Sequence, residues 1–268
     1  MIGSSTKPLT TLMMAKLIDI ERFTWTTPVT QILPRFSLAD TDVTSRLEMR
    51  HTVSACTGMP RRDVDLLFRF QGIRPEDRLA EIKEMLPTTG LGETFQYSSC
   101  LVAAGGYAAA HCFAPNSSLA DAYDSAMRQF VFEPLNMQQT SVLHHASPDD
   151  ASPHGFDLEG NPVPIDPVME EFADAVAPAG SVWSTILDMA SYVRCELRNG
   201  KSDTGEQVVS LENVMACVSL RSKSMGRAAT GSAWFLQNSN ASRKSRMVAT
   251  LLASLRTCCL YLNTASAW

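Results

Sequence analysis

The chain has 268 residues, of which 45% are hydrophobic and 19% are charged, and its formal net charge at pH 7 is −5. This composition excludes an intrinsically disordered chain, which would have too few apolar residues to bury a core. The length allows one large domain or two small ones.

No segment of the sequence predicts export or a membrane span. The N-terminus lacks the basic region and long apolar stretch of a signal peptide, and the apolar run 247–255 is too short to cross a bilayer. The seven cysteines have neither metal-ligand nor paired spacing, which is typical of reduced thiols. We therefore expect a cytoplasmic protein with no membrane span and no metal.

Apolar residues at helical spacing predict three helices in the chain. The first follows Ser4 and has its apolar stripe at residues 9–20, the second covers 119–131, and the third covers 186–197. Ser184 or Thr185 is the expected N-cap of the third helix, and Asn199-Gly200 closes it. A further apolar segment, 101–110, is expected to form a packed helix. The polar, proline-rich text of 147–167 predicts a long loop with a hairpin turn at 159–161.

The segment Ser4-Ser5-Thr6-Lys7 opens the first predicted helix and contains a candidate nucleophile. Ser4 and Lys7 are three residues apart and lie on one helical face. A serine hydroxyl needs a neighbouring base to take its proton, and a helix N-terminus favours a developing oxyanion. The spacing indicates acyl transfer through an ester on Ser4. The alternative interpretation is an ordinary serine N-cap.

Five segments in chain order resemble motifs of the serine β-lactamase and penicillin-binding protein family. The resemblance is to its class C-like branch, which includes esterases, D-aminopeptidases and fungal acyltransferases. The segments are 2–10 (IGSSTKPLT), 25–34 (WTTPVTQILP), 52–60 (TVSACTGMP), 95–99 (FQYSS) and 179–190 (AGSVWSTILDMA). The resemblance implies an α+β fold, the α/β sandwich of the β-lactamase type.

The resemblance also implies roles for individual side chains. Ser4 would be the nucleophile, Lys7 the base, and Tyr97 the acid–base partner that shuttles protons to and from the leaving group. Because a phenol titrates near 10, Tyr97 would need a nearby cation such as Lys7 to lower its pKa. Ser99 stands where the Tyr-x-Asn motif has Asn, so it is the candidate substrate-binding residue. Ala55 stands where the family turn has His.

The chain departs from the family pattern at both ends. Three residues precede Ser4, where members of the family carry sheet strands, and no convincing copy of the third motif follows. The segment Ala229-Thr230-Gly231 lacks the basic residue of that motif. We therefore expect a truncated member that retains the helical subdomain and has an incomplete central antiparallel sheet. Its unpaired sheet edges would favour self-association.

The charge of the chain is distributed unevenly. No acidic residue follows Glu212, so the formal charge is about −12 up to that residue and +7 beyond it. A basic tail that binds nucleic acid or an anionic membrane is one explanation. The interpretation we favour is a shifted reading frame or alternative splice. The predicted organisation is thus a partial β-lactamase-related domain at 1–237 and an unrelated, disordered or frame-shifted tail at 238–268.

Other polar groups have the wrong context for a site. His144, His145 and His154 have no zinc-ligand spacing, and Gly105-Gly106 lacks the pattern of a nucleotide loop. Arg61-Arg62 is interpreted as a short solvated basic run. His51 and His111 are interpreted as packing or surface residues.

Three functions remain open. The first is hydrolysis of a small ester or amide, and the second is transfer of the same acyl group to an alcohol or amine in a secondary-metabolite pathway. The third is an inactive truncated remnant. No cofactor and no nucleic-acid partner are expected.

Overall fold

The structure is a computed structural model that describes residues 1–145 and 150–223. The predicted tail at 238–268 and the candidate third-motif segment Ala229-Thr230-Gly231 lie outside the described residues. The described elements, in chain order, are η1 (Gly3–Ser5), α1 (Thr6–Asp19), α2 (Val29–Ile32), α3 (Thr41–Arg46), α4 (Met49–Val53), α5 (Asp63–Phe68), α6 (Pro75–Ile82), α7 (Ser99–Phe113), α8 (Leu119–Met127), η2 (Arg128–Phe132), β1 (His154–Phe156), β2 (Pro162–Pro164), η3 (Pro167–Val176), α9 (Ala177–Gly180), α10 (Ile186–Leu197) and α11 (Leu211–Lys223).

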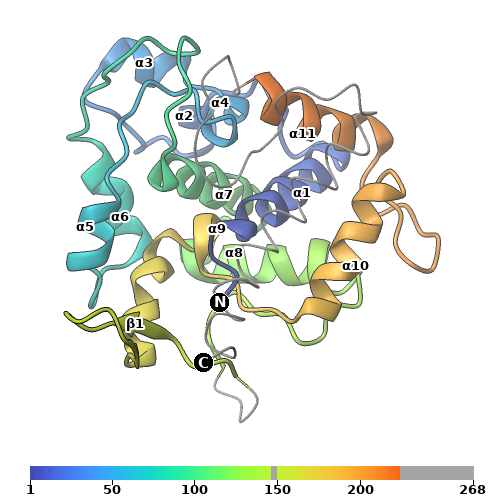
Figure 1. The fold of residues 1–268 in the computed structure, drawn as a ribbon. Helices are drawn as coiled ribbons and strands as arrows, with labels where there is room; N and C mark the ends of the chain where they lie inside the picture. Colours follow the sequence, from blue (N-terminus) through green and yellow to red (C-terminus); the bar gives the residue numbers. More distant parts are fainter. Residues whose placement is uncertain (146–149, 224–268) are drawn as a thin grey trace, which may run out of the picture.

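Helices α1 and α7 form the centre of the molecule, and the other helices surround them (Figure 1). All residues of α1 from Thr6 to Ala15 are buried, and so are all residues of α7 from Cys100 to Ala110. A helix that is apolar all round belongs in the interior of a protein. Burial of α1 is therefore wider than the single stripe that the sequence predicts.

Glycines allow α7 to pack closely against its neighbours. A Cβ atom added to Gly105 would lie 2.0 Å from Oγ1 of Thr52 in α4, and one added to Gly106 would lie 2.4 Å from Cβ of Pro178 in α9. Neither distance is compatible with a side chain. The two glycines therefore allow close helix packing.

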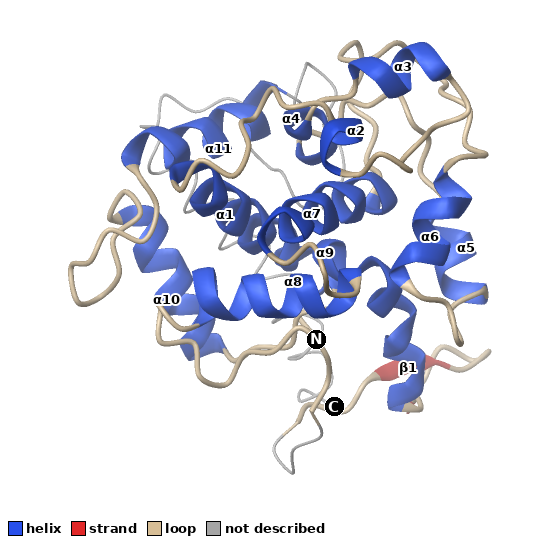
Figure 2. Cartoon of the chain, turned by 180° about the vertical axis from the view of Figure 1, so that it is seen from behind, coloured by secondary structure: helices blue, strands red, loops and turns tan. Residues whose placement is uncertain are grey.

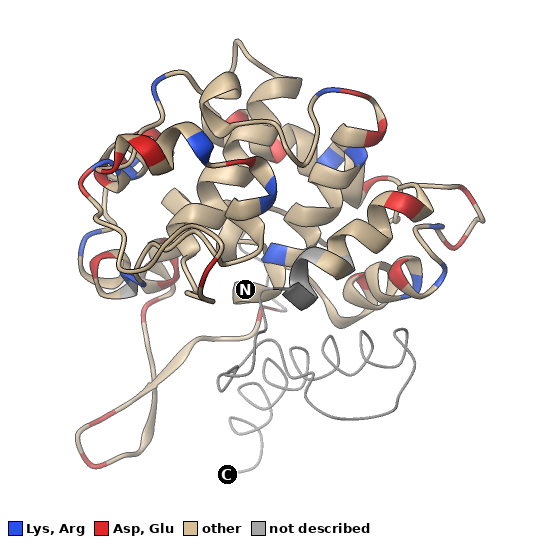
Figure 3. Ribbon diagram, turned by 90° about the horizontal axis from the view of Figure 1, so that it is seen from above, with Lys and Arg blue, Asp and Glu red and all other residues tan. Residues whose placement is uncertain are grey.

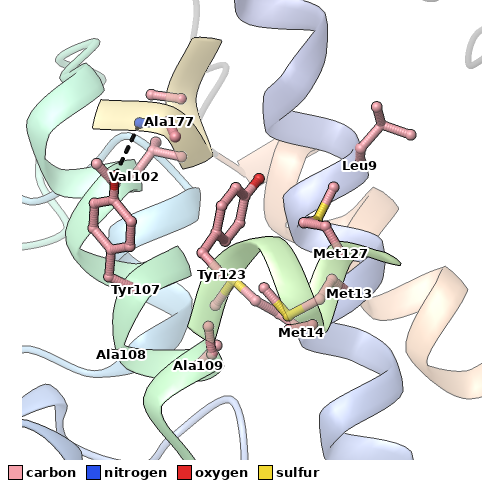
Figure 4. Close-up of a cluster of buried hydrophobic side chains, with 14 of the residues drawn as sticks. Leu9, Met13, Met14, Val102, Tyr107, Ala108, Ala109, Tyr123, Met127 and Ala177 are labelled. Atoms are coloured by element: carbon pink, nitrogen blue, oxygen red, sulfur yellow. Dashed lines mark hydrogen bonds between the residues drawn. The ribbon is translucent and has the colours of Figure 1, made fainter. Parts of the chain in front are cut away.

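Two tyrosines join α7 and α8 to the rest of the core. Figure 4 shows Tyr107 and Tyr123 within the cluster that also contains Met13 of α1, and the two rings pack edge to face with centroids 5.8 Å apart. The backbone N–H of Ala177 donates to the Tyr107 hydroxyl at 3.1 Å, and the Tyr123 hydroxyl contacts Thr10 Oγ1 at 2.7 Å. Each buried phenol thus has a polar partner.

The predicted N-cap and C-terminal end of the third helix, α10, are confirmed, and so is the hairpin in the long loop. Thr185 caps α10, because its side chain accepts a hydrogen bond from the backbone N–H of Asp188. Asn199 and Gly200 have φ values of 59° and 85° directly after this helix. In the loop, β1 pairs antiparallel with β2 in the register His154↔Pro164.

This hairpin is the one sheet within the described residues, and it lies at the edge of the molecule (Figure 2). Helices form the rest of the regular structure, so the mixed helix-and-sheet class is confirmed. The described part of the chain is mainly a helical subdomain, as the sequence predicts.

Within the described part of the chain, no helix has both the length and the apolar character that a bilayer span requires. Acidic and basic residues are distributed over many separate elements and loops rather than gathered in one patch (Figure 3).

Candidate active site

Ser4 lies at the N-terminal end of the central helix. It belongs to the 3₁₀ turn Gly3–Ser5, which continues directly into α1. Gly3 has a φ of +51°, which glycine adopts readily, and the backbone N–H of Ile2 donates to the carbonyl of Val182 at 2.8 Å. The turn is therefore fixed to the segment after α9, and it places an exposed hydroxyl at the positive end of the α1 dipole.

The hydroxyl of Ser4 contacts two ionisable side chains. Nζ of Lys7 donates to Ser4 Oγ at 3.0 Å, and the Tyr97 hydroxyl lies 2.5 Å from the same atom. The Lys7 side chain is held by a second hydrogen bond, from Nζ to the carbonyl of Ala179 at 2.7 Å, and it is 5% exposed. The N-cap alternative is not observed, because Ser5 occupies the N-cap position of α1 and makes no side-chain capping bond. This arrangement can move a proton to and from Ser4 Oγ.

The charge of Lys7 changes the acidity of Tyr97. Burial of the phenol opposes its ionisation. The nearby ammonium of Lys7, which lies 4.6 Å from the ring centroid, and hydrogen bonds from Lys7, Ser4 and Ser99 act in the other direction. Together these interactions outweigh burial, so the pKa of Tyr97 lies below its ordinary value of 10.0. Lys7 is therefore the nearby cation that the sequence analysis expects to lower the pKa of Tyr97.

A pair of hydrogen-bonded segments holds Tyr97 in place. The backbone N–H of Gln96 donates to the carbonyl of Ala55 at 2.7 Å, and the N–H of Gly92 donates to the carbonyl of Cys56 at 2.8 Å. Gly58 completes the turn with a φ of +77°, and a Cβ atom there would lie 2.2 Å from the carbonyl oxygen of Thr89. The turn at 55–58 and the segment that leads to Tyr97 thus form one unit.

Ser99 is the fourth predicted site residue, and it is the first residue of α7. Its hydroxyl makes a hydrogen bond with the Tyr97 side chain, which contributes to the lowered pKa of Tyr97. Ser99 also lines a pocket of about 180 Å³ together with Ser4 and Tyr97. The structure thus brings all four predicted residues together at the point where α1, α7 and α9 meet.

The rest of the pocket wall is mainly apolar. It includes Leu66 and Leu67 of α5 and Phe172 and Val176 of η3. These residues were not predicted, because no periodic or motif signal connects two short helices 100 residues apart.

Arg61 also lines the pocket, and its guanidinium carbon lies 5.1 Å from the centroid of the Tyr97 ring. The interpretation of Arg61 as part of a solvated basic run is therefore incomplete. The signal that could have identified it is its position directly after the 52–60 motif.

The histidines are not part of this site. Nδ1 of His51 accepts a hydrogen bond from the backbone N–H of Glu48 at 3.1 Å, so its ring caps α4. Burial, reinforced by the neighbouring Arg50 charge, lowers the pKa of His51. Nε2 of His144 pairs with Asp150 at 2.8 Å on the surface. Across the residues whose placement is described, no group of three or more His, Cys, Asp or Glu side chains could hold a metal ion.

Comparisons with known proteins agree with the geometry. The family model described as Beta-lactamase matches residues 1–252. Penicillin-binding protein 4 from Amycolatopsis lactamdurans is 25% identical over 221 residues, which covers 78% of this chain and 53% of the relative. The chain thus spans about half the length of that relative.

Solved structures share the fold at low sequence identity. The octameric penicillin-binding protein homologue from Pyrococcus abyssi superposes with a TM-score of 0.63 at 20% identity, over 80% of this chain and 47% of the homologue. EstCE1, a hydrolase with promiscuous acyltransferase activity, has a TM-score of 0.63 at 18% identity, over 79% of this chain and 61% of EstCE1.

Proposed function

The chain belongs to the β-lactamase family, and from that premise we propose that it is a serine hydrolase acting on a small ester or amide through an acyl-enzyme on Ser4. The observation that carries the proposal is the contact of Ser4 Oγ with both Lys7 Nζ and the Tyr97 hydroxyl at the wall of one pocket. A serine with two proton-transfer partners at hydrogen-bond distance is an activated nucleophile.

In the proposed acylation step, the ammonium of Lys7 first loses a proton to solvent, and Lys7 then acts as the base in its neutral amine form. Ser4 Oγ forms a bond to the substrate carbonyl carbon while its proton moves to Lys7 Nζ. The negative charge that develops on the carbonyl oxygen is stabilised by the N-terminal end of α1. Tyr97 donates a proton to the leaving oxygen or nitrogen as the bond from the carbonyl carbon breaks, and a proton from Lys7 restores the phenol.

Deacylation reverses these roles with a different nucleophile. Water bonds to the carbonyl carbon, loses a proton to the neutral amine of Lys7, and displaces Ser4 Oγ, which takes the proton back from Lys7. An alcohol or amine that reaches the ester before water would give acyl transfer instead. The similarity to EstCE1, whose own description includes promiscuous acyltransferase activity, favours acyl transfer as the second candidate. A role in secondary metabolism is part of the proposal. Self-association is also proposed, and the octameric state named in the description of the Pyrococcus abyssi homologue supports it.

The proposal is tested by intact-mass labelling with a fluorophosphonate and with a penicillin. We expect a single adduct on the wild-type protein and none on Ser4→Ala. Ser5→Ala is the matched control, because Ser5 is the adjacent serine, is 9% exposed and is not among the residues that line the pocket. Equal labelling of Ser4→Ala would contradict the assignment of the nucleophile. Absence of any adduct on a cooperatively folded protein would favour the inactive remnant.

A further inference from the structure

Helix α5 continues the apolar wall of the pocket onto the surface of the protein. The helix lies at the periphery of the molecule (Figure 1), and its residues Leu66 and Leu67 line the pocket that contains Ser4. Leu66 is buried, whereas Leu67 is 46% exposed. Leu67 therefore belongs both to the pocket and to the outer surface.

Two further apolar side chains extend this surface beyond the pocket. Val64 is 66% exposed and Phe68 is 81% exposed, and neither of them lines the pocket. Counted from Val64, Leu67 and Phe68 are the i+3 and i+4 positions of α5, so the three side chains are neighbours on one helical face. We call these three residues the α5 stripe. Adjacent exposed apolar side chains of this size are typical of a surface that binds something.

The 3₁₀ helix η3 shows the same continuation on the neighbouring side of the pocket. Phe172 lines the pocket, and Met169, three residues earlier in η3, is 46% exposed. Side chains at i and i+3 lie above one another in a 3₁₀ helix, so Met169 extends the edge that Phe172 begins. Helices α5 and η3 contact each other. The apolar surface thus leaves the pocket along two neighbouring elements.

The size of the pocket indicates why its wall continues outside it. The pocket volume of about 180 Å³ is smaller than the several hundred Å³ of typical ligand sites. A chain that is too long for this volume and is bound at Ser4 must place its far end on the exterior. An apolar surface receives an aliphatic chain favourably, because contact removes methylene groups from water.

We infer that the site selects esters with an uncharged aliphatic acyl chain that is longer than the pocket, such as octanoyl, and that the α5 stripe binds the far part of the chain. The inference rests on the proposed acyl-enzyme function, because it names the substrate class of the same site. The first carbons of the chain contact Leu66 and Phe172 inside the pocket, and the later carbons contact the α5 stripe.

The test compares two esters that share a leaving group and differ in chain length. We expect the wild-type protein to hydrolyse p-nitrophenyl octanoate with a kcat/KM about tenfold higher than p-nitrophenyl butanoate, because the four additional methylenes are partly removed from water. Val64→Ser/Phe68→Ser should lower this ratio to about one. Because both side chains are exposed, urea unfolding of this variant should match that of the wild type.

Ile186→Ser/Leu187→Ser is the matched control. Ile186 and Leu187 are adjacent exposed apolar residues of α10, and neither lines the pocket. This variant should keep the full ratio. A ratio that persists in Val64→Ser/Phe68→Ser, or equal kcat/KM values for the two esters in the wild-type protein, would overturn the inference. If Val64→Ser/Phe68→Ser changes the oligomeric state in size-exclusion chromatography and keeps the ratio, the α5 stripe is instead an interface between copies of the chain.

Binding to Ser4→Ala separates this inference from the proposed function, because that variant cannot form the acyl-enzyme. Calorimetric titration should show that ethyl octanoate binds about tenfold more tightly than ethyl butanoate. The difference should disappear when Val64→Ser and Phe68→Ser are added to Ser4→Ala. If turnover is absent but this difference is observed, the chain-length selectivity stands and the hydrolase proposal fails. Equal affinities for the two esters would contradict the selectivity, whatever the turnover.

Discussion

Replacement of Lys7 by methionine isolates the base of the proposed reaction. Methionine keeps a straight side chain in a position that is 5% exposed, and it removes the amine that lies 3.0 Å from Ser4 Oγ. General acid–base catalysis by one positioned group contributes about 10²–10⁴ in rate. Tyr97 still contacts Ser4 in the variant, so one proton-transfer partner is lost and one is kept. We therefore expect the rate of Ser4 acylation to fall about 10³-fold, which corresponds to about 4 kcal/mol of activation free energy.

The same replacement should have a small effect on folding. Lys7 loses its charge-assisted hydrogen bond to the carbonyl of Ala179, an interaction of about 1.5–3 kcal/mol. Removal of a buried ammonium relieves a desolvation penalty of comparable size, so the free energy of unfolding should change by less than about 2 kcal/mol. Activity and stability are thus expected to separate in Lys7→Met.

The assay is the rate of fluorophosphonate labelling followed by intact mass, together with urea unfolding of each protein. Lys16→Met is the control, because it removes a lysine from the last turn of the same helix. Labelling of Lys7→Met within tenfold of the wild-type rate, with unfolding unchanged, would refute Lys7 as the base.

Three further predictions follow from contacts elsewhere in the structure. The first tyrosine to ionise in a spectrophotometric titration should do so below pH 10.0, because the pKa of Tyr97 is lowered, and Tyr97→Phe should remove that transition. Gly105→Ala should reduce the free energy of unfolding by about 1–3 kcal/mol, because its Cβ would meet Thr52, and urea unfolding of Gly105→Ala/Thr52→Ala should show partial recovery. Burial raises the pKa of Asp174 above 3.8, so ionisation of this carboxyl destabilises the fold as pH rises through that range. Asp174→Asn should therefore be more stable than the wild type at pH 7 in urea unfolding, with a gain that shrinks toward pH 3; an equal gain at both pH values would contradict this assignment.

The sequence predicts α8 and α10 well, because each of them buries one patterned face. It does not predict α11 (Leu211–Lys223), although that helix is of similar length. Helices α8 and α10 begin at Leu119 and Ile186, as their apolar spacing indicates. The short helices α2 to α6 have four to eight residues each, which is too few for a period to be recognised. Their ends depend on local polar contacts, such as the hydrogen bond from the backbone N–H of Arg74 to the Asp77 carboxylate.

The candidate site depends on contacts between distant parts of the chain. The spacing of Ser4 and Lys7 within one helical turn is a local signal, so the sequence indicates this pair directly. Tyr97 is 93 residues away from Ser4, and no spacing rule connects them. Its role could be proposed only from the order of motifs that resemble a known family. The carbonyl of Ala179, which holds Lys7, lies within one of those motifs, but a backbone acceptor leaves no mark in a residue pattern.

The position of Ser4 at a helix N-terminus determines how the proposed activity should be detected. In the proposed reaction, Ser4 is the nucleophile, Lys7 the base and Tyr97 the acid–base phenol, and the start of α1 stabilises the oxyanion. Removal of one oxyanion-hole donor in a serine hydrolase costs about 10²–10³ in kcat and leaves the nucleophile intact. If the oxyanion is stabilised only by the start of α1, which is the one oxyanion donor proposed within residues 1–145 and 150–223, the site should turn over unactivated esters slowly and still react with a fluorophosphonate, whose phosphorus is already strongly electrophilic. Covalent labelling of Ser4 consequently reports the proton-transfer geometry of Lys7 and Tyr97, whereas ester turnover reports that geometry together with oxyanion stabilisation.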